Sequence, residues 1–168
     1  MRPLTNIKKA PLEIAQLLAN NKELVKLLVN DSPSALNEEI TIPDVNSLIS
    51  DQYINFYGPT EYGIQNFDRT AFISVFIDNG SYNHTDKNMN VSVIVYYCTK
   101  TDSILLDNNK NRLLEAVDRI FDSLDQQKVS AAGKLEGSSI NYVFLDDFHI
   151  GYRMRFTLND QQNRKVEF

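Results

Sequence analysis

Two apolar runs near the middle of the chain have the composition of β-strands. Residues 69–78 and 91–98 are rich in Val, Ile, Phe and Tyr, which fit a pleated, half-buried surface. The residues between them, 79–90, are polar and rich in Asn. The pattern predicts two neighbouring strands joined by a long polar loop.

Apolar residues recur at helical spacing after the second strand. Over residues 107–125 they form a wide stripe, and polar residues such as Arg112 take the remaining positions. The stripe consists of Leu113, Leu114, Val117, Ile120, Phe121 and Leu124. The pattern predicts one long amphipathic helix that packs its stripe against the strands.

Both faces of the predicted strand pair are apolar. One face carries Ala71, Ile73, Val75, Ile77, Val91, Val93, Val95 and Tyr97, and the other carries Phe72, Phe76, Ile94 and Tyr96. An antiparallel sheet with one face in water would alternate more regularly, so each face needs a cover. The long helix covers one face. We expect the N-terminal helices to cover part of the other, with a neighbouring subunit as a further candidate.

Two short helices are predicted before these strands, over residues 11–20 and 22–29. Leu, Ile and Val recur there at helical spacing, and Asn20 and Asn21 interrupt the pattern. Pro11 is compatible with a first helical turn, because its missing N–H would be unpaired there anyway. Residues 31–41 read as a loop, residues 42–49 as one or two helical turns, and residues 53–57 as a short strand.

The C-terminal part predicts two more strands. Residues 126–139 are mostly polar, with two glycines that break regular structure, and apolar strand-like runs follow over residues 140–145 and 148–158. In the last run apolar residues alternate without a break with polar ones, so one face is core and the other presents His149, Arg153 and Arg155.

Together these elements predict an α+β fold with a mainly antiparallel sheet of about four to five strands, one long helix and short N-terminal helices. The chain has 168 residues and 42% hydrophobic content, enough for one ordinary core. We expect a single domain over residues 1–158 and a polar tail over residues 159–168.

Charge and cysteine content narrow the partners and the compartment. The net charge of -5 argues against a surface that grips phosphate backbones, which needs clustered Lys and Arg. Cys98 is the only cysteine, so a disulfide within the chain is impossible, and at the end of a strand it reads as a small buried hydrophobe. The chain lacks a signal-peptide pattern and any apolar stretch of membrane-spanning length, so we expect a cytoplasmic protein without a membrane partner.

No residue pattern announces catalysis or a cofactor. Asp146, Asp147 and His149 form at best a weak metal-binding trio, and a solvated corner between strands is the better interpretation. Gly133 and Lys134 lack the other residues of a phosphate-binding loop, and no serine lies in a Gly-x-Ser-x-Gly turn. We therefore expect no enzyme, no metal and no cofactor.

Several of these stretches, in this order, resemble the small tail-completion, or tail-terminator, proteins of long-tailed bacteriophages. Residues 21–28 resemble their leader helix, and residues 54–59 resemble the short strand and Pro turn before the sheet. Residues 70–97 resemble the central strands with their loop, and residues 111–120 resemble the helix that follows. The resemblance covers about residues 24–158.

The resemblance implies a structural virion protein of the neck region, assembled in the host cytoplasm. Such proteins form a ring, commonly a hexamer, that caps the tail tube and receives the head-side connector, while DNA passes through the lumen without specific binding. The expected subunit or partner contacts are Phe72, Phe76, Ile94, Tyr96, Tyr82, His84, Arg153, Arg155 and Phe168. The alternatives are another neck protein (a head-completion adaptor or stopper) and, outside viruses, a cytoplasmic adaptor or small-ligand-binding domain.

Overall fold

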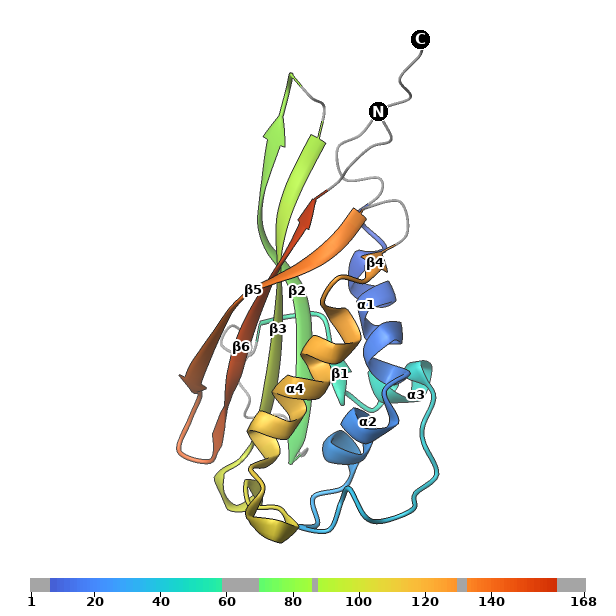
Figure 1. Cartoon of the computed structure of the whole chain (residues 1–168), viewed down its shortest axis with the longest axis vertical. Helices are drawn as coiled ribbons and strands as arrows, with labels where there is room; N and C mark the ends of the chain where they lie inside the picture. The colour runs from blue at the N-terminus through green and yellow to red at the C-terminus, as the bar shows by residue number, and fades with distance from the viewer. Residues whose placement is uncertain (1–6, 59–69, 86–87, 130–132, 160–168) are drawn as a thin grey trace.

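The computed structural model describes residues 7–58, 70–85, 88–129 and 133–159, and its centre is a six-stranded sheet (Figure 1). The strands, in chain order, are β1 (Ile54–Asn55), β2 (Ala71–Asn83), β3 (Asn88–Lys100), β4 (Lys128–Val129), β5 (Gly133–Phe144) and β6 (His149–Asn159). Across the sheet the order is β1-β2-β3-β6-β5-β4. β1 is parallel to β2, and the other neighbouring strands are antiparallel.

The α+β class is confirmed, but the predicted number of strands was too low. The additional strand, β4, has two residues, too few to leave an alternating pattern in the sequence. The polar residues after position 126 were expected to be irregular, yet β5 already begins at Gly133. The backbone groups of this stretch pair with β6 whatever side chains they carry.

The helices are α1 (Ala10–Ala19), α2 (Lys22–Val29), α3 (Val45–Ser50) and α4 (Arg112–Leu124). The predicted break between the first two is confirmed, because Asn21 begins α2 by accepting the backbone N–H of Leu24 at 3.1 Å. The side-chain amide of Asn21 also donates to Ser123 Oγ of α4 at 3.0 Å. This residue therefore joins the N-terminal helices to α4.

The single long helix predicted over residues 107–125 is wrong in length. α4 has 13 residues, and the segment before it forms the short 3-10 turns η2 (Thr101–Ser103) and η3 (Asp107–Asn109). Asn108 has a positive φ of 63°, which interrupts a helix, and Asn111 caps α4 by accepting the N–H of Leu113 at 2.9 Å. Helical spacing in the sequence did not reveal this interruption.

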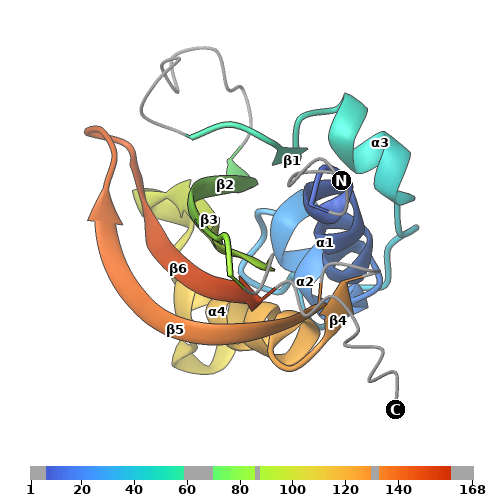
Figure 2. The same cartoon turned by 90° about the horizontal axis from the view of Figure 1, so that it is seen from above.

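The sheet is strongly curled, and α1, α2 and α4 pack on one side of it (Figure 2). α1 and α2 contact β2, whereas α4 contacts β3, β5 and β6. The core between the helices and this face of the sheet includes Ile14, Leu18, Leu24, Leu28, Ile73, Val75, Val93, Val95, Leu113, Ile120, Met154 and Phe156. The expectation that the N-terminal helices cover the opposite face was therefore wrong, since they share the face that α4 covers.

Two β-bulges contribute to the curl. The register of β2 shifts at Asp78, and that of β5 shifts at Ser138. Val93 of β3 and its partner Phe156 of β6 lie between the two shifts, so both bulges fall in one row across the sheet. A bulge bends its strand and increases the local twist, and two in one row bend the whole sheet there.

The polar loop predicted over residues 79–90 is mostly strand. β2 continues to Asn83 and β3 resumes at Asn88, so the two strands form a ribbon that projects beyond the helices (Figure 1). Most of the described side chains of this ribbon are exposed and polar, which is why the sequence resembled a loop. Backbone pairing between the strands holds it instead.

Candidate interaction surface

The sheet face opposite the helices holds six of the predicted contact residues. Phe72 and Ile94 are fully buried, and Phe72 packs with Cys98. Phe76 and Tyr96 are half-buried, and their rings stack with centroids 6.0 Å apart. Phe72 and Ile94 thus offer no surface to a partner in this conformation, and the aromatic surface left on this face is the Phe76–Tyr96 pair.

Arg153 and Arg155 share one carboxylate on this same face. Each has a guanidinium nitrogen 3.6 Å from Asp78 Oδ2. Asp78 occupies the β2 bulge, which directs its side chain towards the two arginines. Such exposed ion pairs are worth roughly 0 to 1 kcal/mol each, so the cluster orders this face more than it stabilises the fold.

The remaining predicted contact residues are Tyr82, His84 and Phe168. Tyr82 and His84 lie near the end of the β2–β3 ribbon, where their rings meet edge to face with centroids 4.9 Å apart. Phe168 lies outside the described residues. The structure therefore groups six of the nine predicted contacts on one face and places two at a distance from them.

His149 was predicted on a polar face, but its side chain is buried. Its Nδ1 lies 3.1 Å from Asp146 Oδ1, and that carboxylate also accepts the backbone N–H groups of Phe148 and His149 at 2.7 Å. Burial alone would raise the pKa of Asp146, but these hydrogen bonds outweigh it and hold the pKa below its usual value. Asp146 thus closes the turn between β5 and β6, as an ionised acceptor.

Neither a metal cluster nor an activated thiol emerges from the described residues. Burial raises the pKa of the Cys98 thiol, which disfavours the nucleophilic thiolate. No three His, Cys, Asp or Glu side chains in the described ranges gather closely enough to hold a metal ion. The prediction that Cys98 is a small buried hydrophobe is confirmed.

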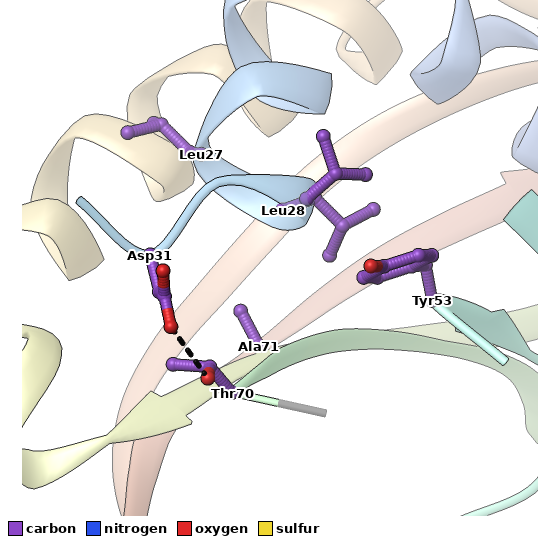
Figure 3. Close-up of a pocket in the computed structure, with 7 residues that line it drawn as sticks. Leu27, Leu28, Asp31, Tyr53, Thr70 and Ala71 are labelled. Carbon is purple, nitrogen blue, oxygen red and sulfur yellow. Dashed lines mark hydrogen bonds between the residues drawn. The ribbon is translucent and has the colours of Figure 1, made fainter. Parts of the chain in front are cut away.

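Described residues line two hollows that a small ligand could enter. The first, of about 190 Å³, lies between α2 and the start of β2, and Asp31 there accepts a hydrogen bond from Thr70 at 3.3 Å (Figure 3). This first hollow is smaller than most ligand pockets, which hold roughly 300 to 1,000 Å³. The second, of about 440 Å³, is an open depression at the base of the ribbon, lined mainly by small polar side chains such as Ser81, Ser92 and Thr157.

A different surface collects the most exposed large apolar side chains of the described residues. These are Leu105, Leu114, Ile140, Tyr142, Phe144 and Phe148, with exposed fractions from 48% to 68%. We call them the β5–β6 apolar surface. Leu105 and Leu114 belong to the segment entering α4 and to its first turns, and the other four belong to the β5–β6 hairpin. The segment entering α4 is tied to the hairpin, since Thr101 donates its N–H to the Phe148 carbonyl at 2.8 Å.

This surface is exposed because the hairpin extends away from α4 (Figure 1). α4 lies closely over the first half of β5, where a Cβ on Gly137 would be 2.4 Å from the ring of Phe121. Ile140, Tyr142 and Phe144 lie on the same face of the sheet, yet past the point where the helix covers it. Exposed large apolar side chains that gather on one part of a surface usually mark a contact with a partner, whereas isolated ones do not.

The outer edge of β5 adds a second feature to this surface. β4 pairs only with Gly133 and Lys134, so in the described part of the chain residues 138–144 have no strand on that edge. Their sequence, Ser-Ser-Ile-Asn-Tyr-Val-Phe, contains no charged residue and no proline. Open edges in natural proteins are usually protected by charges, prolines or bulges. Here the bulge at Ser138 stands at the start of the stretch, and the edge beyond it carries none of these devices, which indicates a contact.

Sequence reasoning identified the hairpin strands and missed the surface they create. The alternation of Ile140, Tyr142 and Phe144 with Asn141 and Val143 indicates one apolar face. Whether that face is buried depends on how far α4 reaches along β5, which the pattern does not contain.

Comparison with known proteins gives a family. The family model described as YomW matches residues 21–158, which span α2, α3, α4 and the described strands up to the last residue but one of β6. No curated protein matches the chain. No helix of the described residues is long and apolar enough to cross a bilayer. The name of this family derives from a phage. The chain belongs to the YomW family of phage-related proteins.

Proposed function

We propose that the chain is a structural subunit of a phage virion, a tail terminator that forms a ring. The ring caps the tail tube and joins it to the head-side connector. Its partners are copies of the same chain, the tail tube protein and the head-tail connector proteins, and DNA passes through the lumen without specific binding.

The β5–β6 apolar surface is the observation that carries this proposal. It holds six large apolar side chains with exposed fractions from 48% to 68%, which suit burial against another copy of the chain. The membership of a phage-related family supports a virion context. The net charge of -5 suits a lumen through which DNA slides, because an acidic wall repels phosphate.

The alternatives differ in what the described residues offer them. Another neck protein, an adaptor or a stopper, would use the same apolar surface and differ only in its position in the particle. A small-ligand-binding domain would need an enclosed pocket, and the hollow beside Asp31 and Thr70, at about 190 Å³, is smaller than such pockets usually are. The apolar surface therefore favours a subunit of an assembly over a small-ligand-binding domain.

The proposal is tested by charging the apolar surface. The Tyr142→Lys variant places an ammonium group near the C-terminal end of β5, where Tyr142 is 56% exposed. Assembly should weaken by about 10- to 100-fold, because a buried aromatic contact is replaced by a charge without a partner. Light scattering after size-exclusion chromatography, over a series of protein concentrations, measures the shift.

Leu12→Lys is the matched control. Leu12 lies on α1 and is 45% exposed, so the same change of an exposed apolar residue falls outside the β5–β6 apolar surface. It should assemble like the wild type and keep the wild-type thermal unfolding midpoint. Tyr142→Lys should lower that midpoint only slightly, because it removes the edge-to-face contact with the Tyr152 ring, whose centroid lies 5.7 Å away. The proposal fails if the wild type stays monomeric at every concentration, or if Tyr142→Lys assembles as the wild type does.

A further inference from the structure

The sheet has two open edges, at its opposite ends. One is the edge of β5 over residues 138–144, described above. The other is the edge of β2, because β1 pairs only with Ile73 and Ser74 and leaves the rest of β2 without a strand neighbour among the described residues. Each copy of the chain thus offers two different strand edges to other molecules.

Exposed aromatic side chains flank the β2 edge as well. Phe56 and Tyr57 follow β1 directly and lie beside β2, where a Cβ on Gly58 would be 3.5 Å from the ring of Phe76. Tyr82 lies farther along β2, and all three flanking side chains are 37% exposed. Both open edges are therefore bordered by apolar side chains, which suits contact of one with the other.

The faces and directions of the two edges are compatible. Tyr82 lies opposite Met89, on the sheet face that also carries Val91, Ile140 and Tyr142. β2 and β5 run in opposite directions in the sheet. If copies repeat in one orientation, β2 of one copy lies antiparallel to β5 of the next, with Tyr82 on the same face as Ile140 and Tyr142.

The free parts of the two edges also lie at different heights. In β2 the free part runs towards the ribbon at one end of the molecule, and in β5 it runs towards the β5–β6 turn at the other end (Figure 1). Pairing them displaces each copy along its neighbour's strands. Closed barrels require such a stagger, because their strands tilt relative to the barrel axis.

We propose that β2 of one copy adds to the open edge of β5 of the next copy, so that the sheets run continuously around the ring. The inference rests on the proposed ring and names the strands that join its subunits. The contact is heterologous, and closure leaves neither edge unpaired in any copy. A symmetric contact of β5 with β5 of a second copy would leave both β2 edges open.

Cysteine cross-linking tests this pairing. Ser81→Cys on β2 is combined in turn with Ser139→Cys, Asn141→Cys or Val143→Cys on β5, three positions that share one sheet face and sample the register. The native Cys98 is buried and does not compete. Assembled protein is oxidised and separated on a denaturing gel without reductant, with each single variant as a control.

At least one double variant should give a ladder of covalent multimers longer than a dimer, while the single variants stay unlinked. Dimers formed by Asn141→Cys alone would show β5 paired with β5 and overturn the inference. So would the absence of cross-links from all three double variants in protein that light scattering shows to be assembled. If the cross-links form but phage particles assemble normally without the chain, the strand pairing is supported and the proposed function is contradicted.

Discussion

Replacing Arg112 with Met is expected to lower the free energy of unfolding by about 3 to 5 kcal/mol. Arg112 opens α4, and its guanidinium is buried, with 1% of the residue exposed. It donates to four backbone carbonyls at 2.7 to 2.9 Å, those of Leu27, Asn30, Ser32 and Ser103. Met fills much of the same volume but donates no hydrogen bond, so all four carbonyls lose the Arg112 donor. The Leu27 and Ser32 carbonyls still accept from the Tyr97 hydroxyl and the Ala35 N–H.

The Arg112 carbonyl contacts explain why the loss is large. Leu27 and Asn30 lie at the C-terminal end of α2, where carbonyls lack partners within the helix and carry partial negative charge. Arg112 therefore holds the end of α2, the loop after it and the segment entering α4 together. Tyr97 assists by donating its hydroxyl to the Leu27 carbonyl at 2.9 Å, and burial raises its pKa, so it stays a neutral donor.

Arg119→Met is the control for this prediction. Arg119 lies on the same helix, and its side chain is 32% exposed and faces Glu115 and Asp122 at 3.8 and 4.0 Å. Its replacement should cost less than about 1 kcal/mol, since partly exposed ion pairs contribute little. Urea unfolding followed by circular dichroism measures both variants. Equal losses for Arg112→Met and Arg119→Met would contradict the role assigned to Arg112.

Gly151→Ala is expected to lower the free energy of unfolding by about 2 to 3 kcal/mol. Gly151 lies in β6 opposite Cys98 of β3, and a Cβ there would be 2.2 Å from the Tyr97 carbonyl oxygen and 2.8 Å from Cys98 Sγ. The carbonyl is backbone in the middle of the sheet, so β3 and β6 would have to move apart. Thermal or urea unfolding would record the loss.

Gly80→Ala distinguishes a backbone clash from a general cost of replacing a strand glycine. A Cβ on Gly80 would be 2.8 Å from the terminal carbon of Met89 and 3.0 Å from Cγ1 of Val91. Met89 is flexible and can turn away, and Val91 needs to move by only a few tenths of an ångström. We expect a change below about 1 kcal/mol. Adding Cys98→Ala to Gly151→Ala should recover little stability, because the Tyr97 carbonyl remains. If the double variant regained the full wild-type stability, the clash with Cys98 Sγ, and not the one with the Tyr97 carbonyl, would be the cause of the loss.

Helices and strands could be predicted where the spacing of apolar side chains in the sequence matches the period of the element that forms. The strands around Ile73 and Val93 and the break at Asn21 followed from it. The β2–β3 ribbon could not be predicted in this way, because backbone pairing holds its strands together while most of its side chains are polar and exposed. The start of α4 could not be predicted either, since a positive φ at Asn108 does not change the spacing of apolar residues in the sequence.

The candidate surface was harder to predict than the fold. Arg112 stands at a polar position of the helix pattern, and only the approach of α2 makes it a buried donor. Phe72 and Ile94 were expected at an interface because their face seemed to need a cover, yet both are buried within the chain. Tyr142 and Phe144 are ordinary strand residues in sequence, and they become surface because α4 ends its contact near Gly137.

Disruption of the gene in a phage that encodes this chain tests the central claim most directly. Electron microscopy of the lysate should show filled heads and free tails that are not joined, with tails lacking a defined head-proximal end. Supply of the wild-type chain should restore joined particles, Leu12→Lys should restore them equally, and Tyr142→Lys should not. Joined, infectious particles of normal form in the absence of the chain would contradict the account.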